Sequence, residues 1–170
     1  MLKKFARTMA YIGGIVTGFY LFASAPGIHK KTKWQHLTGW DYAHRGLYDN
    51  EHGIPENSMA AFHRAVDKGY GIELDVHLTA DNQLVVFHDD TLTRMCGVNK
   101  KISSFLYSDL MQLRLLGTEE GIPLFKDVLE LIDGKVPLII ELKVDGSNQN
   151  LLCPLVWQLL SRYKGDYCIE

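Results

Sequence analysis

The sequence has few cysteines and no strong excess of charge of either sign. Only Cys96, Cys153 and Cys168 occur among 170 residues, they lie far apart, and no CxxC spacing is present. An odd, scattered set argues against a disulfide framework and against a zinc site built from thiolates. The 18 basic and 20 acidic residues give a net charge of −2, which supplies no basic surface for nucleic acid. We therefore expect neither a disulfide scaffold nor a nucleic-acid-binding protein.

Charged residues are also missing from a long stretch near the N-terminus, residues 8–29. A membrane-spanning helix needs about 20 mostly apolar residues, and Tyr11 and Tyr20 would suit the two membrane interfaces. We therefore interpret residues 1–30 as an uncleaved N-terminal membrane anchor, with a span of about residues 8–27, followed by a tether at 31–39. The expected location is the membrane, with a single pass. Basic residues flank both ends of the stretch, so its orientation is not specified.

Two other interpretations of this stretch remain open. The small residues Ala23, Ser24 and Ala25 are typical of the end of a signal peptide, although Pro26 directly after them favours an uncleaved segment. The second alternative is a helix buried in a protein core. The glycines at positions 13, 14 and 18 argue against it, because glycine weakens a helix in water.

The rest of the chain alternates strand-like and helix-like segments. Strands are predicted near Tyr42, Leu74, Val86, Ile140 and Cys168. Helices are predicted at residues 59–68, 108–116, 125–132 and about 150–163. This alternation indicates an α/β fold with a mainly parallel sheet. The connection between the second and third strands has about six residues, too few for a parallel crossover, so these two strands should form a hairpin.

Acidic residues occur within strands that are otherwise apolar. Glu73 and Asp75 are two positions apart, so their side chains project from one face of the strand, and Glu141 repeats the pattern in a later strand. Buried carboxylates are costly unless they are paired, protonated or bound to a cation. Three of them together would form an oxygen site suited to Mg²⁺ or Ca²⁺. The alternative is a buried ion-pair cluster, in which Arg45 pairs with Glu73 and Lys143 with Glu141.

Two histidines also stand at strand ends. His44 ends the first predicted strand, and His88 follows the third. A histidine can donate or accept a proton near neutral pH, so two of them beside a cation would suit acid/base catalysis of phosphoryl or acyl transfer. The hairpin is expected to place His88 next to Glu73, which would join the metal and acid/base halves of one site.

Six blocks of residues occur in a definite order along the chain. They are Ala43-His-Arg-Gly46, Pro55-Glu-Asn-Ser58, Ile72–Thr79, Val86–Arg94, Gly121–Leu129 and Pro137–Lys143. Together they resemble the glycerophosphodiester phosphodiesterase family, from about Asp41 to the end of the chain. The resemblance implies a TIM-type (β/α) barrel that hydrolyses small glycerophosphodiesters to sn-glycerol 3-phosphate and an alcohol. It also implies a divalent cation, Ca²⁺ or Mg²⁺, as cofactor.

The resemblance further implies a role for each matching position. The expected acid/base pair is His44, as base, and His88, as acid. The positions that match the metal ligands are Glu73, Asp75 and Glu141. The positions expected to hold the phosphate oxygens are Arg45 and Lys143. A possible rim of the site comprises Glu56 and Asn57. In the mechanism that the family suggests, the glycerol hydroxyl of the substrate attacks phosphorus, and water then opens the cyclic phosphate.

The length of the chain limits these expectations. A (β/α)8 barrel usually needs about 250 residues and at least about 200, whereas this chain has 170. We therefore expect residues 40–170 to form a phosphodiesterase domain that is incomplete at its C-terminus, with about the first five strands. The chain alone should then show little phosphodiesterase activity. A lysophospholipase D-like enzyme of the same superfamily and a noncatalytic membrane protein remain as alternatives, and the oligomeric state stays open.

Overall fold

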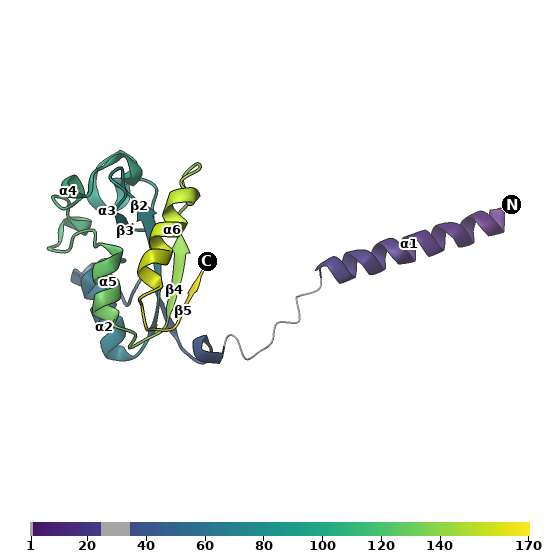
Figure 1. Ribbon diagram of the computed structural model, residues 1–170, viewed down its shortest axis with the longest axis horizontal. Coiled ribbons are helices and arrows are strands. Elements are labelled where there is room, and N and C mark those ends of the chain that lie inside the picture. The colour runs from purple at the N-terminus through teal and green to yellow at the C-terminus, as the bar shows by residue number, and fades with distance from the viewer. Residues whose placement is uncertain (1, 25–34) are drawn as a thin grey trace. The chain divides into compact units, whose positions relative to one another are not determined.

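The computed structural model describes residues 2–24 and 35–170 and divides into two units. One is the N-terminal segment up to residue 34, and the other is residues 35–170. Within the first unit, α1 (Leu2–Ser24) is a continuous helix of 23 residues (Figure 1). The expected tether lies partly outside the described residues, and η2 (Gln35–Leu37) forms a short 3-10 helix within the rest of it.

The α1 helix corrects the prediction of a membrane anchor. Among the described residues, none of the helices combines the length and the apolar character that crossing a bilayer requires. The glycines at positions 13, 14 and 18, together with Thr17 and Tyr20, lower the mean hydropathy of α1. Residues 25–27 of the expected span lie outside the described residues. The prediction of a transmembrane helix, of membrane contact through it and of a membrane location is therefore wrong.

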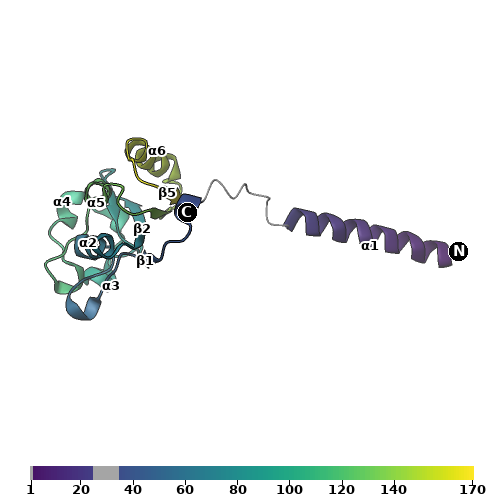
Figure 2. The same ribbon diagram turned by 90° about the horizontal axis from the view of Figure 1, so that it is seen from below.

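The second unit is built on a five-stranded, mainly parallel sheet (Figures 1 and 2). Its strands are β1 (Tyr42–His44), β2 (Gly71–Leu78), β3 (Leu84–Val86), β4 (Leu138–Leu142) and β5 (Tyr167–Ile169). Four of them are parallel in the order β1-β2-β4-β5, while β3 pairs antiparallel with β2. The predicted strands, the hairpin and the parallel-sheet α/β class are therefore confirmed.

Three helices cover one face of the sheet. They are α2 (Met59–Lys68), α5 (Phe125–Ile132) and α6 (Gln149–Leu160). Their apolar side chains form one buried cluster with Ile72, Leu74 and Val76 of β2 and with β4. Because side chains alternate across a strand, the residues between these positions point to the opposite face. The packing of the helices thus directs Glu73 and Asp75 away from the hydrophobic core.

The helix α2 illustrates how local sequence sets an element. Ser58 precedes the helix, and its hydroxyl accepts a hydrogen bond from the Ala61 N–H at 3.2 Å, which is typical of an N-cap. Gly69 ends the helix in the left-handed conformation, with φ of 71°, which glycine adopts without strain. The predicted helix at residues 59–68 is therefore confirmed at both ends.

The segment between β3 and α5 differs from its prediction. Instead of one helix at residues 108–116 it contains α4 (Tyr107–Leu110), and Leu116 has a left-handed φ of 51° inside a short 3-10 turn. The shorter elements here and before α2 are α3 (Thr93–Cys96), η3 (Asn50–His52), η4 (Ile102–Ser104) and η5 (Leu115–Gly117). Of these, α3, η4 and η5 contribute with α4 to a second, smaller apolar cluster around Phe87 and Leu92.

Candidate active site

The acidic residues and His44 come from three adjacent strands. In the register of the sheet, His44 of β1 lies opposite Glu73 of β2, and Asp75 lies opposite Glu141 of β4. Glu73, Asp75 and Glu141 each offer a carboxylate oxygen, and these oxygens lie within 4.8 Å of one another. The sheet therefore brings together the three carboxylates that the sequence predicted as a cluster.

The carboxylate cluster has the donor chemistry of a site for a hard divalent cation. Asp75 is fully buried, and its Oδ1 atom lies 2.9 Å from the Lys143 ammonium. Ca²⁺ and Mg²⁺ prefer carboxylate oxygens, and three carboxylates within 4.8 Å of one another are costly unless positive charge balances them. Glu73, Asp75 and Glu141 thus fit a divalent cation.

Lys143 lies beside the cluster and contacts two of its members. Its Nζ is 2.9 Å from Asp75 Oδ1 and 2.6 Å from Glu141 Oε1. Burial by itself would lower the pKa of Lys143, but the contacts with Glu141 and Asp75 raise it overall. The ammonium is therefore charged at neutral pH. The ion pair between Lys143 and Glu141, expected under the alternative reading, is present.

The pKa values of Glu73 and Asp75 are shifted in opposite directions. Burial, reinforced by the neighbouring charge of Asp75, raises the pKa of Glu73. Burial acts in the same direction on Asp75, but the contacts with Lys143 and Asn57 outweigh it and lower the pKa of Asp75. Neighbouring carboxylates whose pKa values shift in opposite directions are typical of functional sites.

Arg45 and Asn57 adopt strained backbone conformations next to the cluster. Their φ angles are 58° and 53°, in the left-handed region that non-glycine residues seldom occupy. The Arg45 N–H donates to Glu73 Oε2 at 3.0 Å, and Asn57 Nδ2 donates to Asp75 Oδ2 at 2.9 Å. Asn57 N–H also donates to the Arg45 carbonyl at 2.9 Å, which links the two strained residues. Backbone strain of this kind is concentrated at functional sites.

The ion-pair alternative expected the guanidinium group of Arg45 to pair with Glu73. The guanidinium group contacts other carboxylates instead. Arg45 Nη1 donates to Glu56 Oε1 at 2.9 Å, and Arg45 Nε is 3.8 Å from Asp75 Oδ2. Glu56 is 5% exposed and Asn57 is 1% exposed, so both lie beneath the site surface. Glu56 contacts Arg45, and Asn57 contacts Asp75. These two buried residues thus support the site residues from beneath.

The two histidines stand at strand ends with different partners. The His44 side chain is exposed, and its Nε2 is 3.8 Å from Glu73 Oε2. His88 Nδ1 is 2.7 Å from Asp89 Oδ1. The hairpin places Phe87 next to Asp75, whose carbonyl accepts the Phe87 N–H at 3.0 Å, so His88 follows directly at the same end of β2.

Sequence reasoning missed Asp89 and Arg94 as part of this site. Arg94 donates to both Asp89 and Glu56, and Asp89 contacts His88. Both residues lie inside the block from Val86 to Arg94, so their position next to His88 was the available signal. Their partner Glu56 is 38 positions from Arg94, and nothing in the local pattern indicates that pairing.

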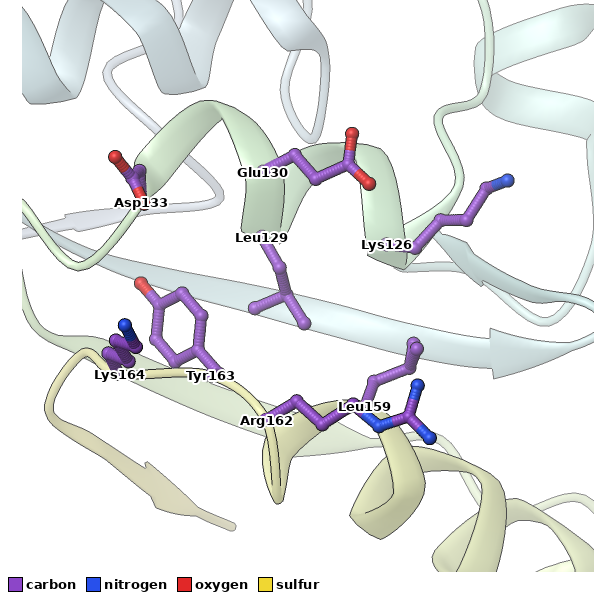
Figure 3. Close-up of a pocket in the computed structure, with 8 residues that line it drawn as sticks. All are labelled: Lys126, Leu129, Glu130, Asp133, Leu159, Arg162, Tyr163 and Lys164. Atoms are coloured by element: carbon purple, nitrogen blue, oxygen red, sulfur yellow. The ribbon is translucent and has the colours of Figure 1, made fainter.

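A cavity of about 350 Å³ lies elsewhere, between α5 and α6. Figure 3 shows Leu129 from α5 facing Leu159 from α6 and Tyr163 just after it, with charged side chains around them. The charged residues that line it are Lys126, Glu130, Asp133, Arg162 and Lys164. None of the expected site residues lines this cavity, so it is separate from the carboxylate cluster.

A family model places this arrangement among known proteins. The model described as "Glycerophosphoryl diester phosphodiesterase family" matches residues 44–161, which begin at His44 and include the carboxylate cluster. The chain belongs to this family. The resemblance noted in the sequence is therefore confirmed.

Curated members of the family share a substantial part of the sequence. A lysophospholipase D of Rattus norvegicus is 33% identical over 172 aligned positions, covering 94% of this chain and 52% of that protein. A glycerophosphodiester phosphodiesterase of Caldanaerobacter subterraneus subsp. tengcongensis is 40% identical over 111 positions, covering 59% of this chain and 44% of that protein. The chain thus spans about half the length of the curated relatives it matches.

Solved structures show the same fold. A phosphodiesterase of Oleispira antarctica, in complex with the product sn-glycerol-3-phosphate, has a TM-score of 0.70 and 26% identity over 78% of this chain and 57% of its own. A glycerophosphodiester phosphodiesterase of Parabacteroides distasonis has a TM-score of 0.64 and 34% identity over 76% of this chain and 56% of its own. The parallel-sheet α/β fold of residues 35–170 therefore matches glycerophosphodiester phosphodiesterase barrels.

Proposed function

We propose that this protein is a metal-dependent phosphodiesterase that hydrolyses glycerophosphodiesters to sn-glycerol 3-phosphate and an alcohol. Membership of the family supports the reaction class, and the observation that carries the proposal is the carboxylate cluster. Its oxygens lie within 4.8 Å of one another, next to the positive charges of Arg45 and Lys143. A phosphodiester is an anion, so its site needs both a cation and donors where charge develops in the transition state.

Glu73, Asp75 and Glu141 are the residues that would hold the divalent cation, Ca²⁺ or Mg²⁺. When bound, such an ion would supply positive charge that polarises the phosphoryl group. Lys143 already lies 2.9 Å from Asp75 Oδ1, so its ammonium is placed to hold a phosphate oxygen close to the carboxylates. Arg45 is held by Glu56 and offers further N–H donors to the same anion. These two side chains would bind and orient the substrate.

His44 and His88 are the proposed acid/base pair. His44 is exposed beside Glu73, where its ring can take the proton of the attacking hydroxyl group. His88 has its Nδ1 against Asp89, so Nε2 is the ring atom left to protonate the alkoxide that departs. The proposed first step forms a bond from the glycerol hydroxyl oxygen to phosphorus and breaks the bond to the alcohol. Water would then open the cyclic phosphate with the two proton transfers reversed.

The test is hydrolysis of glycerophosphocholine by a purified full-length version of the protein, with Ca²⁺ or Mg²⁺ and with a chelator. We expect release of choline that requires the metal and falls by about 100-fold or more in His44→Ala and His88→Ala, since general acid–base catalysis contributes roughly 10²–10⁴-fold. His63→Ala is the matched control, because His63 is an exposed residue of α2 that contacts Asp67. Metal-dependent release that is unchanged in both site variants would refute the proposed pair.

A lysophospholipase D activity is the second candidate, favoured by one observation. The rat protein described as a lysophospholipase D matches 94% of this chain. The two candidates differ in whether the glycerol carries an acyl chain. Parallel assays with glycerophosphocholine, which has no acyl chain, and lysophosphatidylcholine, which has one, separate the two candidates. Both substrates release choline, so one readout compares their rates of hydrolysis. A large preference for the acylated substrate would favour the second candidate, and no metal-dependent release from either would favour a noncatalytic protein.

A further inference from the structure

An unbroken series of side-chain contacts connects Arg45 to His88. Arg45 Nη1 donates to Glu56 Oε1 at 2.9 Å. Glu56 in turn accepts from Arg94 Nη2 at 2.7 Å and Arg94 Nη1 at 2.9 Å. Arg94 also donates from Nε and Nη2 to the two oxygens of Asp89, at 2.8 and 2.9 Å. Asp89 Oδ1 is 2.7 Å from His88 Nδ1, where the series ends.

Arg94 is the central member of this series because it holds two carboxylates at once. A guanidinium group is planar and presents its N–H donors in a rigid arrangement that matches two carboxylate oxygens. Here one guanidinium makes a paired contact with Glu56 and a second paired contact with Asp89. A lysine ammonium is a point donor and cannot reproduce both paired contacts. The residue type therefore matters, and not only the charge.

Burial and charge both keep this arrangement in place. The Glu56 side chain is 6% exposed, so its carboxylate depends on its two arginine partners for hydrogen bonds. Burial alone would raise the pKa of Glu56, but the hydrogen bonds from Arg94 and Arg45 hold it below its ordinary value. The hydrogen bond from Arg94 is also the main reason why the pKa of Asp89 falls to about 2. Both carboxylates are thus ionised around Arg94 at neutral pH.

We infer that Arg94 is a positioning residue for His88. By binding buried Glu56 and Asp89 together, Arg94 holds the Asp89 carboxylate against Nδ1 of His88. An ionised carboxylate can only accept a hydrogen bond, so the neutral His88 ring carries its proton on Nδ1 and leaves Nε2 for proton transfer. The inference deepens the proposed function and rests on it, since it explains how the acid/base histidine is kept in one tautomer and one orientation.

The test reads the tautomer of His88 directly in the 170-residue chain. Nitrogen-15 NMR of the imidazole ring distinguishes a proton on Nδ1 from a proton on Nε2, and it needs no substrate. We expect the neutral His88 ring to be in the Nδ1–H form in the unchanged chain. In Arg94→Met, Asp89 loses its partner, and we expect a mixture of both tautomers. Arg114→Met is the matched control, since the Arg114 side chain donates to carbonyls of Met111 and Leu113.

Two further variants keep the inference testable if Arg94→Met does not fold. In Arg94→Met, the buried Glu56 carboxylate keeps Arg45 as its partner but loses Arg94. The double variant Arg94→Met with Glu56→Gln removes this partly unpaired charge. Arg94→Lys retains the charge but not the two paired contacts. In both variants we expect the loss of the single tautomer. A His88 ring that stays wholly in the Nδ1–H form in every folded Arg94 variant would overturn the inference, as would an Nε2–H form in the unchanged chain.

Catalysis supplies a separate readout. If the proposed function holds, the Arg94 variants of the full-length version should lower kcat by about tenfold or more, because they affect a general acid, with KM little changed. Choline release with an unaltered kcat in a folded Arg94→Met variant would contradict the positioning role. If no diester is hydrolysed at all but the tautomer changes as expected, the proposed function fails while the positioning of His88 stands.

Discussion

Asp75 is the single residue on which the proposed metal site depends most. It is fully buried, and it contacts Lys143, Asn57 and, at 3.8 Å, Arg45. Asp75→Asn retains the size of the side chain but removes its charge. We expect the affinity for Ca²⁺ or Mg²⁺ to fall at least about tenfold, equivalent to about 1.4 kcal/mol of binding free energy. Isothermal titration calorimetry of the purified chain measures this change.

Asp67→Asn is the control for that experiment. Asp67 lies exposed on α2 and pairs with His63, so its substitution should leave the metal affinity unchanged. Circular dichroism should show that both variants are folded. Equal affinities in the unchanged chain and in a folded Asp75→Asn variant would exclude Asp75 as a ligand.

Asp89 provides a prediction for acid stability. The hydrogen bonds from Arg94 lower the pKa of Asp89 from 3.8 to about 2 in the folded chain. A lowered folded-state pKa means that the ionised carboxylate stabilises the fold at pH values above 3.8, and that this contribution is lost as the pH falls through about 2. Asp89→Asn should therefore be less stable than the unchanged chain near neutral pH, and the difference should shrink in acid. Urea unfolding at a series of pH values checks this, and a difference that stays constant with pH would contradict it.

The residues of the site were predictable from the sequence only where a local pattern marks them. The alternation of Glu73 and Asp75 with buried apolar residues placed both carboxylates on one face, and the register of the sheet confirms that placement. The burial of Glu56 could not be predicted, because it depends on Arg94, which lies 38 positions further along the chain. Contacts of this kind arise from tertiary packing and leave no periodic signal.

The turn between β1 and α2 provides a prediction at the scale of an element. Gly46 has a φ of 80°, and a Cβ there would lie 2.9 Å from Ala61 Cβ. Gly53 has a similar φ of 77°, but a Cβ there would meet nothing within 4 Å. Gly53→Ala should therefore cost only the backbone strain, about 1–2 kcal/mol. Gly46→Ala should cost a further ~1–3 kcal/mol, because it also forces α2 away from the turn.

Urea unfolding of the two glycine variants measures that difference in the free energy of unfolding. A larger loss in Gly46→Ala would show that α2 packs closely on the turn that carries Arg45. If the two variants lose the same stability, the close approach between Gly46 and Ala61 is not a constraint on the fold.

Clear signals at both ends allowed a helix to be predicted correctly from the sequence. The helix at residues 59–68 has an N-cap serine and a terminal glycine, and both ends are confirmed. The helix expected at 108–116 is wrong beyond Leu110, where α4 ends, and Leu116 has a left-handed backbone that no propensity indicates. For α1, the absence of charge suggested a membrane span, whereas the spacing of glycine and polar residues leaves α1 too weakly apolar to cross a bilayer.

At the scale of the whole molecule, the sheet is open within the part of the chain that the structure describes. The strand order β1-β2-β4-β5 has β1 and β5 at its two ends, so no closed barrel forms there. The solved structures of the family match this unit with about half of their own length. The alternation of strands and helices predicted the class of the sheet, but closure depends on how many strands pair, which no local pattern specifies.

An open edge leads to a prediction about self-association. In the described residues, β5 pairs with β4 on one side, and Ile169 of β5 is 47% exposed. An unpaired strand with an exposed apolar side chain is a template for pairing with another chain. We therefore expect the 170-residue chain to associate with increasing concentration in analytical ultracentrifugation, and Ile169→Lys to shift it towards the monomer. Val144→Lys is the control, because Val144 is 52% exposed but lies outside the strands. A monomer at all concentrations, or equal effects of the two lysines, would show that the β5 edge does not drive association.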